Sequence, residues 1–277
     1  MQMFKHFLNF YINSSIHVAL AVFSLTWITL LEYDIPCDES LLLFVFFASI
    51  SGYNFVKYFG IAKFHHRRLA SWLKTIQVFS FFCFLFLGYY ALLLEMKTLL
   101  VIAGLGLITF LYAIPFLPKH LYLDNKHNLR SIGGLKVYLI ALVWAGVTVF
   151  LPVINNELPV NTDVVITGIQ RFVFIIALML PFEIRDLMYD SLKLATIPQK
   201  IGEKSTKKMG VVLVLLFFFL EFLKNEVTQE TILVSILISM VTGLFVIFSK
   251  KEQGTYYSSF WVEGVPILWL IVVLLLS

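Results

Sequence analysis

Charge is scarce in this sequence: Asp, Glu, Lys and Arg make up only 14% of its 277 residues, against roughly a quarter in soluble domains. Its two cysteines, Cys37 and Cys83, lie far apart, which argues against a disulfide framework and a cysteine metal site. The first residues lack a short apolar core followed by a small-residue cleavage site, so we expect no removable signal peptide. Neither a Ser-His-Asp set, a phosphate-binding loop nor a dinucleotide fingerprint is found. The usual signatures of soluble enzymes are therefore missing.

Apolar residues dominate instead. They form 60% of the chain, with 28 phenylalanines, and they occur in runs of about twenty residues, the length of a transmembrane helix. A soluble fold could not bury so much apolar surface and would expose large apolar patches. The net charge of +4 does not indicate nucleic acid, because in a membrane protein the placement of charges matters more than their sum. We expect an all-α integral membrane protein in the lipid bilayer.

Apolar runs separated by polar breaks predict nine transmembrane helices in a single domain, residues 1–277. The predicted spans are Ile16–Leu31, Leu41–Phe59, Leu73–Leu94, Thr98–Leu117, Ile132–Val153, Val164–Phe182, Met209–Phe222, Ile232–Phe248 and Phe260–Leu276.

Positive charge falls almost entirely on one side of these spans. Every lysine and arginine except Lys97, Lys224 and Arg171 lies on the side of the N-terminus, and retained positive charge marks the cytoplasmic side. We therefore expect a cytoplasmic N-terminus and an outer C-terminus, in a bacterial inner membrane. Arg171 falls inside the sixth span, where we expect its side chain to snorkel to the interface.

Three acids mark the cytoplasmic end of the sixth span. Glu183, Asp186 and Asp190 follow at spacings of three and four, which places them on one helix face. Such a stripe suits Mg²⁺, which takes oxygen ligands and commonly bridges carboxylates to phosphate. The alternative is a solvated helix end whose acids pair with Arg185 and Lys193.

The wider pattern around the acids is E-x-x-D-x-x-x-D, followed by T-x-P-x-x-x-G at Thr196, Pro198 and Gly202. This pattern resembles the second aspartate-rich motif of the UbiA superfamily of intramembrane prenyltransferases. The resemblance implies a bundle of nine transmembrane helices with a cavity open to the cytoplasm, and Mg²⁺ held against a prenyl diphosphate.

Three further stretches also resemble that family: "LYAIPFLPK", "LRSIGGLKVYLIALVWAG" and "FWVEGVPILW". The resemblance implies metal ligands at Glu183, Asp186 and Asp190, the two aspartates also being catalytic. It implies diphosphate-binding residues at Asn54, Lys57, Tyr112, Lys119, Arg130 and Lys136, and a further cavity residue at Glu263.

The first acidic motif of the family, Asn-Asp-x-x-Asp-x-x-x-Asp, is lost here. Asn54 matches its leading Asn, but Phe55, Tyr58 and Ala62 replace the three aspartates. With one stripe of acids instead of two, we expect at most one Mg²⁺. Lys57 either supplies part of the positive charge that a diphosphate needs, as a point charge, or is simply a positive-inside residue.

The resemblance implies transfer of a prenyl group from a prenyl diphosphate to an aromatic, quinone-type or other lipophilic acceptor. The missing first motif keeps a second hypothesis open, a catalytically inactive lipid-binding or scaffold subunit of a membrane complex with a protein partner. A small transporter is a third, disfavoured because the charges lie at the membrane boundary and not at mid-membrane.

Overall fold

The computed structural model describes residues 2–62, 71–113, 134–189 and 195–276, and these residues contain helices and connecting segments but no strand. The chain runs through α1 (Gln2–Asn13), α2 (Ile16–Glu32), α3 (Glu39–Ala62), α4 (Ser71–Ala91), α5 (Met96–Ala113), α6 (Leu135–Ala145), η3 (Gly146–Phe150), α7 (Leu151–Asn155), α8 (Thr162–Asp186), α9 (Ile197–Ile201), α10 (Glu203–Leu220), η5 (Glu221–Leu223), α11 (Gln229–Phe248), η6 (Tyr257–Val262) and α12 (Val265–Leu276). The expected all-helical class is confirmed.

The number of spans is not confirmed as nine. In the described part of the chain six helices are long and apolar enough to cross a membrane, or seven if the bent pair of α1 and α2 forms one span. The described apolar part of α5 is a shorter helix, Met96–Leu111. α10 has only 18 residues, and its first two turns carry Glu203, Lys204, Lys207 and Lys208. Charge at its start therefore shortens the apolar part of α10.

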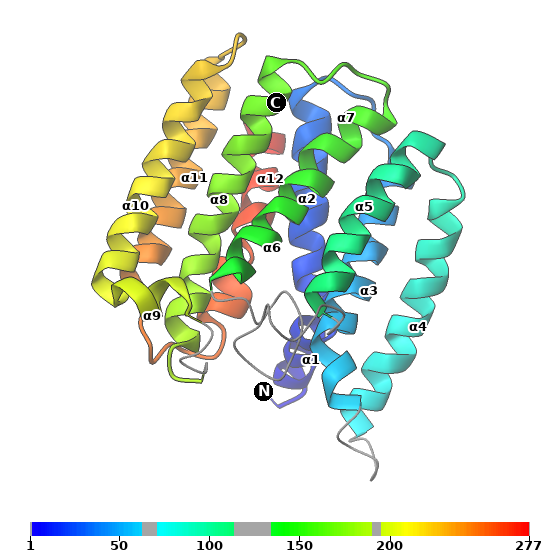
Figure 1. Ribbon diagram of the computed structural model, residues 1–277, viewed down its shortest axis with the longest axis vertical. Coiled ribbons are helices and arrows are strands. Elements are labelled where there is room, and N and C mark those ends of the chain that lie inside the picture. Colours follow the sequence, from blue (N-terminus) through cyan, green and yellow to red (C-terminus); the bar gives the residue numbers. More distant parts are fainter. Residues whose placement is uncertain (1, 63–70, 114–133, 190–194, 277) are drawn as a thin grey trace, which may run out of the picture.

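The helices form one upright bundle with the two termini at opposite ends (Figure 1). α8 lies in the middle of it, and it packs against α6, α10 and α11. Almost three quarters of the residues in its most apolar stretch are buried inside the protein. α9, α10 and α11 lie on one flank, and α3, α4 and α5 on the other (Figure 1). We call the end of the bundle that holds α1 and α9 the site end.

Local sequence explains where α8 begins and how closely its neighbours approach. Asn161 caps the helix by accepting a hydrogen bond from the Val164 amide at 3.0 Å. On the facing α10, a Cβ at Gly210 would lie 2.9 Å from Leu180 of α8 and 2.5 Å from Val246 of α11. Any side chain at this position would therefore force Val246 or Leu180 to move, and glycine lets the three helices approach closely.

A sharp break separates α1 from α2, whose axes differ by 59°. Ser15 at the break adopts a left-handed backbone with φ 64°, which is costly for a residue other than glycine. α3 secures this conformation: Asn54 accepts from the Ser15 hydroxyl at 2.8 Å and donates to the Ser14 carbonyl at 2.9 Å. Lys57 donates to the same Ser15 oxygen at 2.9 Å. The polar turn of α3 thus holds α1 in place.

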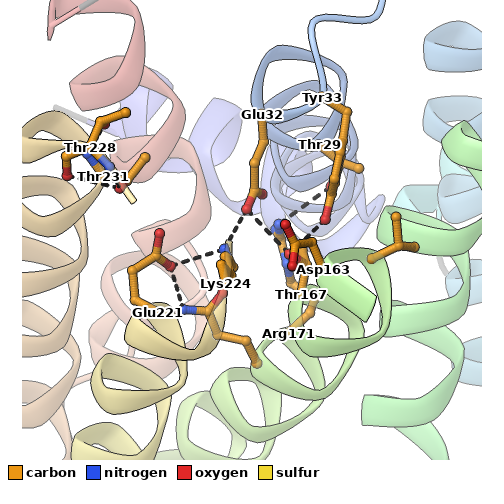
Figure 2. A network of polar contacts seen from close by, with 12 residues as sticks. Thr29, Glu32, Tyr33, Asp163, Thr167, Arg171, Glu221, Lys224, Thr228 and Thr231 are labelled. Carbon is orange, nitrogen blue, oxygen red and sulfur yellow. Dashed lines mark hydrogen bonds and ion pairs between the residues drawn. The ribbon is translucent and has the colours of Figure 1, made fainter. Parts of the chain in front are cut away.

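A buried polar network joins α2, α8 and η5 at the end opposite the site end (Figure 2). Lys224 bridges Glu32 and Glu221, its ammonium lying 2.9 Å from the Glu221 carboxylate. Gln170 donates to Glu221 at 2.9 Å, and Thr167 donates to Glu32 at 3.2 Å. Burial alone would lower the pKa of Lys224, but the charges and hydrogen bonds of the two glutamates outweigh it and raise that pKa. Lys224 therefore stays charged at neutral pH.

Arg171 belongs to the same region, and the expectation that it snorkels is wrong. Its side chain is 1% exposed, and the guanidinium carbon lies 4.8 Å from the centre of the Trp269 ring, within range of a cation–π interaction. It donates to the Leu25 carbonyl and to the Thr29 hydroxyl across the interface with α2. The carbonyl, the hydroxyl and the aromatic ring offset the cost of burying the guanidinium, so the side chain stays inside the bundle and does not extend to the membrane interface.

We predict that Lys224→Met lowers the free energy of unfolding by about 3 kcal/mol, because it leaves the buried Glu221 and the partly buried Glu32 without their cation. Thermal or denaturant unfolding in detergent measures the change. Lys97→Met is the matched control, since its pair with Glu157 is about 70% exposed and should contribute little. Equal losses in the two variants would show that the buried network is not stabilising.

Candidate functional site

Two of the three predicted acids lie where α8 ends at the site end. Glu183 is almost fully buried, with 1% of its surface exposed, and Asp186 follows one turn later at the last residue of the helix. Pro181 sits inside this last part of α8. Its carbonyl accepts a hydrogen bond from Gln253 at 2.8 Å. Asp190, the third predicted acid, lies outside the described residues.

Two cations already meet these two acids. The ammonium nitrogen of Lys136, in the first turn of α6, lies 2.8 Å from Glu183 Oε1 and 3.8 Å from Asp186 Oδ2. Arg185 pairs with the other oxygen of Asp186, with Nη2 at 2.8 Å and Nε at 2.9 Å. Lys136 therefore lies beside two of the three predicted acids, its predicted contact with the diphosphate stays a prediction, and the alternative pairing of Arg185 with an acid occurs.

The two carboxylates have the chemistry that Mg²⁺ needs. Both are oxygen ligands, and the position of Lys136 shows that they can reach one cation from two successive turns. In the described part of the chain, no group of three His, Cys, Asp or Glu side chains is placed to hold a metal. The described residues would therefore give an ion two carboxylates and no third acidic ligand, and the expected single Mg²⁺ stays a prediction.

Asn54 and Lys57, predicted to bind the diphosphate, face the break between α1 and α2. Besides its bonds to Ser14 and Ser15, the Asn54 amide donates to the Ser80 hydroxyl at 2.8 Å, so both its oxygen and its nitrogen have partners. Tyr58, at a position where the resemblance would place an aspartate, donates to the Asn13 carbonyl at 2.8 Å. This turn of α3 therefore stabilises the break between α1 and α2 in this chain.

Glu263, the predicted cavity residue, lies between η6 and α12. The preceding helix η6 packs against α8. A role of Glu263 in a cavity stays a prediction.

Three predicted residues have no described side chain. Lys119 and Arg130 lie outside the described residues, and for Tyr112 only its place in the last turn of α5 is described. Their predicted contacts with the diphosphate stay predictions.

The sequence reasoning missed other polar groups at this end. The ammonium of Lys200 lies 3.3 Å from the position that a Cβ of Gly134 would occupy, two residues before Lys136. Tyr11 and His17 form a hydrogen-bonded pair at 2.8 Å across the α1–α2 break. The only available signal for His17 was a polar ring at the start of an otherwise apolar run, which is too common to be decisive.

The fold is shared with a solved structure. The chain is similar to a structure described by the words "Structural and mechanistic insights into the biosynthesis of Digeranylgeranylglyceryl phosphate synthase in membranes", with a TM-score of 0.55 and 17% sequence identity. The likeness covers 100% of this chain and 97% of that one. No protein-family model matches the sequence, and no curated protein matches it. At this identity the likeness establishes the fold.

We predict that Lys136→Met lowers the free energy of unfolding by about 3 kcal/mol, because the buried Glu183 carboxylate loses its nearest cation. The double variant Lys136→Met/Glu183→Leu should recover most of that loss, since removing both charges also removes the cost of burying one alone. Unfolding of the two single variants and the double variant in the same detergent measures the coupling. Additive losses would show that the two side chains do not act as a pair.

Proposed function

We propose that this protein transfers a prenyl group from a prenyl diphosphate to a lipophilic acceptor within the membrane. The observation that carries the proposal is the group of Glu183, Asp186, Lys136 and Arg185, which gathers acids and cations at one end of the central helix. The bundle around it has the fold of a membrane protein described as a digeranylgeranylglyceryl phosphate synthase. Fold and site together favour this chemistry over the alternatives.

Charge balance explains why a metal ion suits the site. Within the stripe, Lys136 and Arg185 already neutralise Glu183 and Asp186, so a diphosphate arriving alone would bring uncompensated negative charge. Mg²⁺ held by the two carboxylates would supply positive charge to the departing diphosphate. Once the acids have that partner, Lys136 and Arg185 are available to donate to phosphate oxygens. Lys200 stands nearby as a further cation.

The apolar interior provides the second requirement. Loss of diphosphate leaves an allylic cation that water would destroy, so the reaction needs a dry cavity. We place this cavity at the site end, between α8 and the polar turn of α3, open to the cytoplasm. In this proposal Lys57 would contribute a positive charge at the edge of the cavity, and the α1–α2 break that Asn54 fixes would form one wall.

One observation favours the second candidate function, a lipid-binding or scaffold subunit. The turn of α3 at which the resemblance would place a second set of acids instead fastens α1, through Asn54, Lys57 and Tyr58. A protein without catalysis could retain the fold and use the cavity for an isoprenoid lipid. Binding measurements separate the two functions.

We predict that geranylgeranyl diphosphate raises the thermal unfolding temperature of the purified protein with Mg²⁺ and not with EDTA. Asp186→Asn should weaken this binding at least tenfold, because it replaces one of the two carboxylates proposed to hold the ion by a neutral amide. Glu203→Gln is the matched control, an acid at the same end that pairs with Lys207 and should leave binding unchanged. Stabilisation that ignores both metal and Asp186 would favour lipid binding, and no stabilisation would favour a scaffold.

A further inference from the structure

α10 and α11 enclose a small hollow at the site end. The two helices run side by side along one flank of the bundle (Figure 1). The hollow is lined by Lys207, Lys208 and Val211 in the first half of α10 and by Ile247 in the last turn of α11. Its volume is about 280 Å³. Ligand pockets in proteins begin at roughly 300 Å³, so the hollow has room for a small polar group and not for a whole lipid.

One wall of the hollow is positively charged. Lys208 is exposed and forms no ion pair with the described residues. Lys207 pairs with Glu203 at 2.9 Å, but both side chains are partly exposed. Lys204 precedes Lys208 by one turn, and like charges four residues apart repel each other on a helix. The start of α10 thus carries three lysines against one glutamate, and an anion in the hollow would offset that surplus.

The other wall is apolar, and it continues along both helices. On α10, Val211 is followed at spacings of four by the exposed Leu215 and Phe219, and on α11 the exposed Ile247 is preceded by the exposed Leu244. Side chains three or four residues apart lie on one face of a helix. From Val211 to Phe219 the helix rises about 12 Å, most of the roughly 15 Å that one leaflet of hydrocarbon spans. Apolar rows therefore lead from the hollow along the outer surface of the bundle.

A charged hollow at the start of apolar rows matches the shape of a phospholipid. Such a lipid places its phosphate at the membrane boundary and its acyl chains along the helices. A lysine ammonium is a compact point charge with three donors, which suits phosphate oxygens, and basic pockets between transmembrane helices bind anionic headgroups. A free phosphate would leave the apolar rows unused. The ammonium of a zwitterionic headgroup would be repelled by the surplus of lysines.

We propose that the hollow between α10 and α11 binds the headgroup of an anionic glycerophospholipid. Lys207 and Lys208 donate to its phosphate, and its acyl chains lie along the apolar rows that begin at Val211 and Ile247. The inference does not depend on the proposed transfer reaction, because none of the lining residues belongs to the acids and cations at the end of α8.

The test is thermal unfolding of the purified full-length protein in detergent, with increasing dioleoyl phosphatidylglycerol or dioleoyl phosphatidylcholine. A ligand that binds only the folded state raises the unfolding temperature. We expect the anionic lipid to act at lower concentration than the zwitterionic one. In Lys207→Gln/Lys208→Gln, the phosphatidylglycerol concentration that gives half of the rise should increase about tenfold. The response to phosphatidylcholine should stay unchanged.

Lys250→Gln/Lys251→Gln is the matched control. It removes the same charge from two exposed lysines just after α11, neither of which lines the hollow. This variant should respond to phosphatidylglycerol as the wild type does. Equal weakening in the two double variants would show that positive charge in general attracts the lipid, and it would overturn the proposal. An equal response of the wild type to the two lipids would also overturn it.

A further variant separates a lipid from a free phosphate. Ile247→Ser removes part of the apolar wall and keeps both lysines, so it should weaken phosphatidylglycerol binding about threefold. Inorganic phosphate at matched ionic strength should not stabilise the wild type. Equal stabilisation by phosphate and by the lipid would show a phosphate site and contradict the proposal. If Lys207→Gln/Lys208→Gln unfolds, Lys208→Gln alone decides, because Lys208 is exposed and forms no ion pair with the described residues.

Discussion

The contact between Lys136 and Glu183 is the interaction on which the site depends. A carboxylate that is 1% exposed inside an apolar bundle is tolerable only beside a cation, because a lone buried charge costs several kcal/mol. Lys136 supplies that cation from α6 at 2.8 Å, so the pair joins α6 to α8 at the site end. The proposed reaction uses the same balance, since Lys136 can turn to a phosphate once Glu183 has another positive partner.

The same rule shapes the opposite end of the bundle. There Lys224 is shared by Glu32 and Glu221, and Arg171 rests on Trp269 with donors directed at α2. These groups lie far from the proposed chemistry, and they fix α2, α8 and η5 relative to one another (Figure 2). Buried charges and their partners therefore hold the helices together at the end away from the proposed chemistry.

Much of this arrangement follows from the sequence. Apolar runs and their polar breaks place the helices, and a spacing of three puts Glu183 and Asp186 on successive turns. The predicted number of nine spans was not confirmed, in part because the charged start of α10 shortens its apolar part. The prediction that Arg171 snorkels was wrong. The sequence shows a charge inside a span, but it does not show that the Trp269 ring and the Leu25 carbonyl will contact the guanidinium. The contacts of Asn54 and His17 depend on the break between α1 and α2 at Ser15. No local sequence pattern predicts a left-handed backbone conformation at a serine.

The central claim is that the acids of α8 and Lys136 form the diphosphate site. A structure of the protein with Mg²⁺ and a prenyl thiodiphosphate, an analogue that resists ionisation, tests it most directly through the distance from Lys136 Nζ to the phosphate oxygens. The account predicts that a diphosphate oxygen lies within hydrogen-bond distance of Lys136 or Arg185, with Glu183 and Asp186 turned to the ion. An analogue bound elsewhere, with Lys136 still on Glu183, would contradict it.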